Sequence, residues 1–201
     1  LESLHLDFEN LKKFIPVQYF EEYGIIDLGG IVDISGKIVG KYADSTLLPT
    51  IDAEVKFQKI SIQTVDYPKI DAINFTAHIT NGEKPDMSQA KVNISNFEIL
   101  SGNSTVQGRG SIAGFENPRY NFSANLDVNL QEFADLIPDS LAQNLEGNIL
   151  ASISSTGILP SNLSDAFVDY VLDNSTMSLN IRNVSALLAD SLQIENFSAN
   201  I

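Results

Sequence analysis

The chain has 201 residues, of which 43% are hydrophobic, with 12 basic and 26 acidic side chains and no cysteine. The formal charge of −14 argues against nucleic acid as a partner, because affinity for phosphates depends on Lys and Arg that displace counterions. The lack of cysteine excludes disulfides, thiolate nucleophiles and cysteine-ligated zinc, and no stretch approaches the roughly 18 apolar residues of a membrane span.

Apolar and polar residues alternate along most of the chain, which is the pattern of a strand with one apolar face. Strands are predicted at residues 51–57, 73–79, 92–100, 106–112, 120–130, 149–153, 177–181 and 194–201. Clean alternation favours antiparallel pairing, because parallel strands covered by helices on both sides read as continuous apolar runs. The pair Asn81-Gly82 between two strand patterns predicts a hairpin. The expected fold is mainly β with two short amphipathic helices, in which the strands either close into a sandwich or form a long curved antiparallel sheet, an open trough or half-barrel; the second arrangement is the one expected here.

The apolar parity changes once within a predicted strand. Apolar residues occupy odd positions up to Phe57 and even positions from Ile60 onward. A β-bulge would absorb this change, and the end of a strand would explain it equally well.

Residues 6–16 align without gaps on residues 128–138, and each segment ends in Ile-Pro. The matched apolar positions have the spacing of one stripe on a short helix, so helices are expected near residues 8–15 and 130–137. Proline disfavours the helical conformation of the residue before it, so both helices are expected to stop there. A glycine-bounded strand follows each proline, which gives an internal repeat of residues 6–40 and 128–157.

The order of these patterns in residues 108–160 resembles the AsmA-like family, which includes TamB-like proteins of the bacterial envelope. That stretch contains a glycine-flanked strand, a strand after Asn117-Pro118, a short helix ending in Ile137-Pro138 and a second glycine-bounded strand. The resemblance implies a periplasmic protein, anchored to the inner membrane in its full-length form, that acts in outer-membrane assembly or phospholipid movement. Residues 1–201 are then expected to be a single elongated β domain excised from a larger protein, with membrane attachment in regions outside it.

Catalytic and metal-binding constellations are not evident. His5 and His78 each lack a second histidine at ligand spacing, and neither accompanies a nucleophile-elbow pattern. Asp52 and Glu54 share one face of a predicted strand, as a glycosidase pair would require, but such coincidences are unavoidable among 26 acids. We therefore expect no enzymatic activity, no cofactor and no metal.

The function depends on what covers the apolar side of the strands, since few helices are predicted. An open trough would accept lipid acyl chains, each methylene contributing roughly 0.8 kcal/mol on burial. The residues expected to line it are Val55, Phe57, Ile73, Phe75, Ala77, Ile79, Tyr120, Phe122, Ala124, Leu126 and Val128. The alternative is a secreted β-sandwich interaction module that binds a protein or glycan through its loops.

Overall fold

The computed structural model of the chain describes residues 3–41, 48–82, 88–114, 117–138, 140–159, 170–171, 173–188 and 192–201. Ten strands form one sheet, in which every strand pairs antiparallel with its neighbours in sequence. The strands are β1 (Ser3–Asp7), β2 (Ile25–Val39), β3 (Thr50–Thr64), β4 (Ile70–Thr80), β5 (Lys91–Ser101), β6 (Ser104–Ala113), β7 (Arg119–Asn129), β8 (Ala142–Ile158), β9 (Ser175–Leu188) and β10 (Gln193–Asn200).

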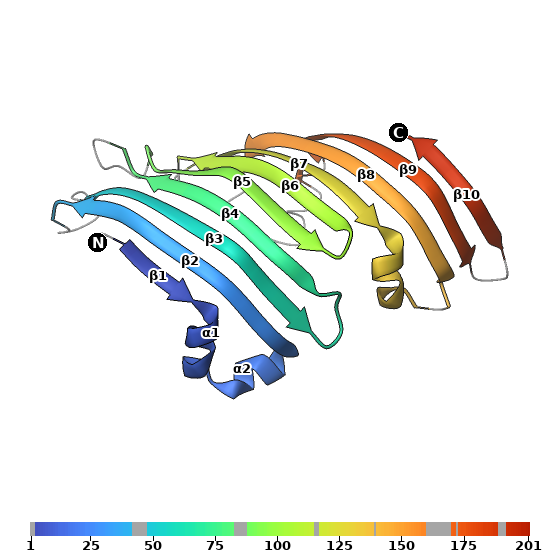
Figure 1. Cartoon of the computed structure of the whole chain (residues 1–201). Coiled ribbons are helices and arrows are strands. Elements are labelled where there is room, and N and C mark those ends of the chain that lie inside the picture. Colours follow the sequence, from blue (N-terminus) through green and yellow to red (C-terminus); the bar gives the residue numbers. More distant parts are fainter. Residues whose placement is uncertain are drawn as a thin grey trace.

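The sheet is long, twisted and curved, and its first and last strands do not meet (Figure 1). The predicted fold class is therefore confirmed. The β-sandwich alternative is wrong in its architecture, because the described strands form one sheet rather than two packed layers.

Short helices lie at one end of the strands (Figure 1). They are α1 (Phe8–Leu11), the 3-10 turn η1 (Lys12–Phe14), α2 (Val17–Glu22) and the 3-10 helix η2 (Leu130–Leu136). The two predicted helices are present, but the sequence did not predict α2, which begins directly after Pro16. None of the helices in the described ranges is long and apolar enough to cross a bilayer.

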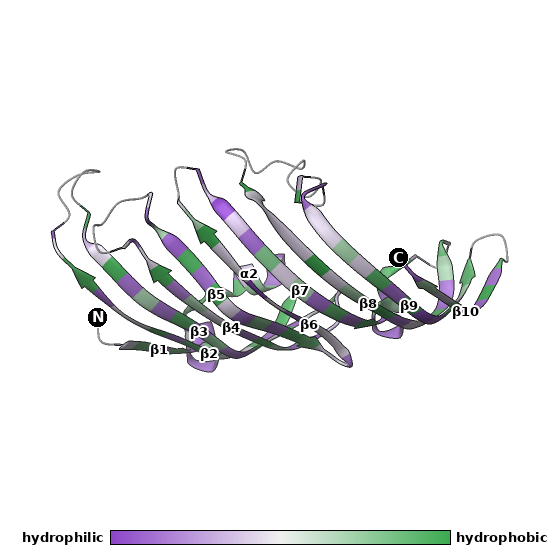
Figure 2. Ribbon diagram, turned by 90° about the horizontal axis from the view of Figure 1, so that it is seen from above, coloured by the Kyte–Doolittle hydropathy of each residue, from purple (hydrophilic) through white to green (hydrophobic). Residues whose placement is uncertain are grey.

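The register places apolar side chains of all ten strands on one face. Residues directly opposite each other in neighbouring strands point to the same side of a sheet. One such row runs from Phe57 through Phe75, Phe97, Gly108 and Ala124 to Ile153. We call this side the apolar face and the other the polar face, and their alternation appears as bands along each strand in Figure 2.

The molecule has little enclosed core. Its accessible surface is 13449 Å², whereas a compact monomer of 22.0 kDa would expose roughly 9,300 Å². The buried hydrophobic residues in the described part of the chain are few: Val32, Ile60, Ala72, Ala77, Ala90, Tyr120, Ala124 and Ala186. Most apolar side chains therefore contact side chains of the neighbouring strands, but no second layer of the described residues covers them.

The change of parity in β3 is a β-bulge, and not the end of a strand. The pairing of β3 with β4 shifts between Phe57 and Ile60, and Lys59 in the bulge has a φ of 51°. Opposite the bulge, Gly30 of β2 has a φ of 108°. A Cβ at Gly30 would lie 2.6 Å from the Cα of Ile60, so only glycine allows the two backbones to approach.

The same bulge occurs again in β8 and β9. Gly147 has a φ of 112° and faces Asn183, whose φ is 51°. The backbone N–H of Lys59 donates to the Asn74 side chain at 3.0 Å, and that of Asn183 donates to Ser198 at 3.1 Å. The equivalence therefore extends past the repeat read from the sequence, and strands β7–β10 correspond to β1–β4.

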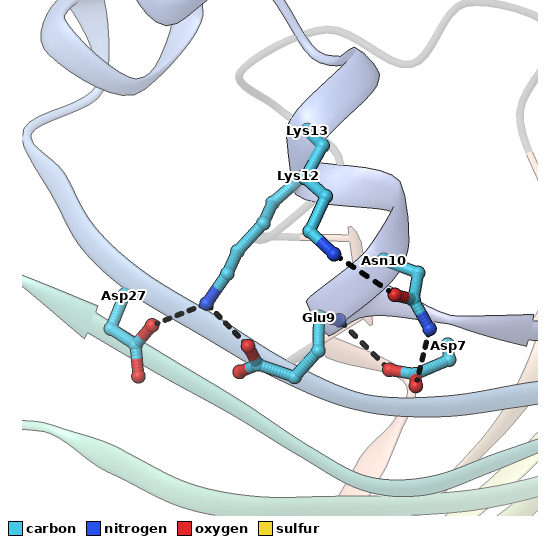
Figure 3. A network of polar contacts seen from close by, with 6 residues as sticks. All are labelled: Asp7, Glu9, Asn10, Lys12, Lys13 and Asp27. Carbon is cyan, nitrogen blue, oxygen red and sulfur yellow. Dashed lines mark hydrogen bonds and ion pairs between the residues drawn. The ribbon is translucent and has the colours of Figure 1, made fainter.

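The two helical segments also begin alike. The Asp7 side chain accepts the N–H of Glu9, and the aligned Asn129 side chain accepts the N–H of Gln131. In the first copy, Asp7 also accepts from Asn10, and Lys12 of η1 forms ion pairs with Glu9 of α1 and with Asp27 near the start of β2 (Figure 3).

Candidate functional site

The candidate site is the middle of the apolar face, where all eleven residues predicted to line a trough lie. They come from β3, β4 and β7, and β5 and β6 lie between β4 and β7 in the sheet. Cross-strand pairs such as Val55–Ala77 and Phe57–Phe75 place the β3 and β4 side chains side by side. Ala77, Tyr120 and Ala124 are buried, and the eight others are partly exposed.

Two aromatic pairs form the most prominent features of this face. The rings of Phe57 and Phe75 meet edge to face, with centroids 5.4 Å apart. Phe97 of β5 and Phe122 of β7 stack across β6, with centroids 6.0 Å apart and nearly parallel planes. Their contact is possible because Gly108 lies between them, where a Cβ would be only 2.5 Å from the Cζ of Phe97.

One end of the apolar face is covered by the residues just before β9. The Tyr120 hydroxyl lies 2.9 Å from the Ser155 hydroxyl, which donates to the backbone oxygens of Val171 and Asn174. Tyr170 contributes its hydroxyl as acceptor for the N–H of Ile158. Tyr120 is consequently part of a small polar core here, and contact with a ligand is expected at the more exposed predicted residues.

At the opposite ends of the strands, two carboxylates accept hydrogen bonds from the β5–β6 turn. Asp71 accepts the N–H of Gly102, which holds the pKa of this carboxyl below its ordinary value. At Glu132 of η2, partial burial raises the pKa, but hydrogen bonds from Ser104 and Asn103 outweigh it, so the pKa is lowered overall. Both carboxylates are thus used to attach a turn to its neighbours.

The acids and histidines considered for catalysis lie on the polar face in separate pairs. Asp52 contacts His78 at 3.0 Å, and Glu54 contacts Lys56 at 2.6 Å, so the two carboxylates have different partners. The prediction that His78 is a surface residue is confirmed, since 48% of its side chain is exposed. Across the described ranges, no group of three or more His, Asp or Glu side chains is placed to hold a metal ion.

The polar face has a shallow hollow of about 670 Å³ over β6–β10. Two rows of residues that pair across these strands line the hollow, and their side chains are mainly amides, hydroxyls and carboxylates. Leu150 is the apolar exception, because it pairs with Asp127 and Asn180 on this face. In this hollow, the side-chain oxygen of Asn125 accepts a hydrogen bond from the Ser152 hydroxyl at 2.7 Å.

Sequence reasoning missed part of the apolar face. The register adds side chains from β1, β2, β5, β6 and β8–β10, among them Leu6, Val32, Phe97, Ile153, Leu179 and Phe197. Alternation alone identified most of these strands, but only the pairing shows that their apolar sides are continuous with those of β3, β4 and β7. Gly30 and Gly147 both begin the glycine-bounded strands of the repeat, so a bulge opposite Gly147, like the one considered between Phe57 and Ile60, would have lengthened the strands predicted at residues 149–153 and 177–181.

Comparison of the chain with known protein families gives no match, and comparisons with curated proteins and with solved structures give none either.

Proposed function

We propose that the chain is a non-enzymatic protein of the bacterial envelope whose apolar face holds lipid acyl chains. It would act in the periplasm, in a protein of AsmA-like type anchored to the inner membrane through regions outside this chain, and assist outer-membrane assembly or phospholipid transfer. The observation that carries the proposal is the continuous apolar face of ten strands, over most of which the described residues place no covering layer.

The size of this face supports a ligand of large apolar area. Ten strands at roughly 4.8 Å spacing, with apolar side chains along roughly 25 Å of each, give a face of roughly 1,200 Å². The largest apolar patch on a typical soluble monomer is about 300–600 Å². Contacts between neighbouring side chains, such as Phe57–Phe75, remove part of this face from water. The area of the face nevertheless exceeds that of the largest apolar patch on a typical soluble monomer.

The expected affinity suits transfer rather than storage. Full burial of one methylene contributes roughly 0.8 kcal/mol, and a chain lying on an open face loses water from about half of its surface. Sixteen carbons then contribute about 6 kcal/mol, which by itself corresponds to a Kd of about 40 µM, and the cost of ordering the ligand weakens binding further. A ligand held this weakly exchanges readily.

The test is saturable binding of a fluorescent sixteen-carbon fatty acid to the purified chain, with displacement by palmitate. Val55→Asn places an amide among the apolar side chains of β3, and we expect it to weaken binding about tenfold, or about 1.4 kcal/mol. Lys56→Asn is the matched control, because Lys56 is the next residue and lies on the polar face. We expect this control to bind like the unmodified chain.

Absence of saturable binding would contradict the proposal, and so would equal loss of affinity in both variants. Circular dichroism of each variant shows whether the sheet is intact, so that loss of binding is not confused with unfolding.

A further inference from the structure

The outer edge of β10 is the strongest further candidate for a binding site. β10 is the last strand in the sheet, and no strand of the described ranges pairs with its outer side. Unpaired strand edges bind other strands through their backbone groups, and proteins usually protect such edges with Lys, Pro or short strands. The eight residues of β10 contain neither Lys nor Pro, and the charged Glu195 and the bulge at Asn196 precede residues 197–201, where the edge continues past them.

The repeat indicates which kind of strand this edge fits. Through the bulges at Lys59 and Asn183, Ile73 of β4 corresponds to Phe197 of β10, since these residues pair with Ile60 and Val184, respectively. In the first copy, β4 pairs on its other side with β5. The position that β5 occupies beside β4 is the position left open beside β10.

Backbone and side chains at the edge agree with this correspondence. Ile201 exchanges two hydrogen bonds with Leu179 of β9, both of 2.9 Å. Because hydrogen-bonding direction alternates along an antiparallel strand, the N–H and C=O of Asn200 point away from β9. Phe197 lies at this edge on the apolar face and is 49% exposed, whereas the corresponding Ile73 lies between the neighbouring Ile60 and Ile99.

We infer that the free edge of β10 is a docking site for an extended antiparallel segment with the alternation of β5. The segment pairs with residues 197–201 in the register in which β5 pairs with residues 73–77 of β4. Its apolar side chains extend the apolar face by one strand and cover Phe197. This inference concerns backbone pairing and does not depend on lipid binding.

The absence of cysteine makes the register directly testable by disulfide trapping. Phe75 of β4 pairs with Phe97 of β5, and Ala199 corresponds to Phe75 because it pairs with Ile181 as Phe75 pairs with Phe57. The probe is a synthetic peptide of residues 91–101 carrying Phe97→Cys, and the protein carries Ala199→Cys. Ala199 faces β9 with its backbone, so its pair across the free edge is the non-hydrogen-bonded kind in which side chains are closest.

We expect the disulfide between Ala199→Cys and the peptide's Phe97→Cys to form at least tenfold faster than one with a peptide carrying Glu98→Cys instead. The two peptides differ only by a shift of one position, which moves the thiol to the other face. Hydrogen exchange of the unmodified protein supplies a second readout, in which the unmodified peptide is expected to slow exchange at the Asn200 amide.

Equal trapping rates for the two peptides, or no protection of Asn200, would overturn the inference. Disulfide-linked protein dimers that form in preference to the peptide adduct would also overturn it, because the edge would then bind a second copy of the chain.

Discussion

The stacked pair Phe97–Phe122 leads to a prediction about two glycines in one strand. Gly108 and Gly110 both lie on the apolar face of β6, opposite Phe97 and Ile94 of β5. A Cβ at Gly108 would overlap the carbonyl oxygen of Ser123 and lie 2.5 Å from the Phe97 ring. A Cβ at Gly110 would lie 3.2 Å from its nearest backbone atom.

Gly108→Ala should therefore destabilise the sheet. Forcing a methyl group into a packed site costs about 1–3 kcal/mol, and loss of the ring stack adds about 0.5–1.5 kcal/mol. The lower backbone entropy of the unfolded alanine variant offsets about 0.5–1 kcal/mol. The net expectation is a loss of about 0.5–4 kcal/mol for Gly108→Ala. For Gly110→Ala we expect a change within about 0.5 kcal/mol, because the entropy benefit of alanine offsets the cost of its tight contact.

Urea unfolding followed by far-UV circular dichroism measures both variants against the unmodified chain. If Gly108→Ala and Gly110→Ala unfold at the same urea concentration, glycine is not needed for the stack, and the packing argument for the centre of the apolar face is wrong.

Four further variants test the repeat and the turn contacts. Lys59→Asn should raise the melting temperature, corresponding to several tenths of a kcal/mol, because asparagine tolerates positive φ better than lysine; an unchanged or lower value would contradict the strain at the bulge. Asp7→Ala and Asn129→Ala should each cost about 1 kcal/mol in chemical unfolding, since each removes the cap of a helical segment; a cost in only one would show that the two segments are not equivalent. The lowered pKa of Glu132 contributes stability that is present above about pH 4.3, the usual glutamate value, and lost as the pH falls through the folded-state pKa. Glu132→Gln should therefore flatten the fall in melting temperature between about pH 5 and pH 3, and a fall as steep as that of the unmodified chain would contradict the role of this carboxylate.

The strands in the middle of the sheet could be predicted from sequence, because their side chains point alternately to the apolar face and to the polar face. Residues 120–130 alternate throughout, and β7 runs over nearly the same range. Alternation predicted β8 at residues 149–153, and the glycine-bounded repeat predicted a strand at residues 147–157, whereas the strand spans Ala142–Ile158. The bulge at Gly147 reverses the alternation there, and no local pattern of residues shows that the strand continues past it.

Proline explains the missed helix. Pro16 was interpreted as a stop, because it disfavours helix in the residue before it. Proline is also well tolerated at the start of a helix, where its missing N–H has no intrahelical partner, and Pro16 is the N-cap of α2. The same residue thus ends η1 and begins α2, and a rule based on one effect could not predict both.

The candidate face was predicted in its composition but not in its contacts. Alternation indicated which side of β3, β4 and β7 is apolar, and those residues do share one face. The burial of Tyr120 depends on hydrogen bonds that link Ser155 to residues far along the chain. Such contacts follow from tertiary structure and leave no periodic signal.

The strictly sequential order of the strands has a consequence for how the molecule assembles and comes apart. Every strand bonds to the strands directly before and after it in the chain, so most contacts join nearby segments, a topology that favours rapid folding. As in other architectures built from repeated units, pairing can start at any hairpin and spread outward. Unfolding should accordingly begin at β1 or β10 and leave a shorter but still paired sheet.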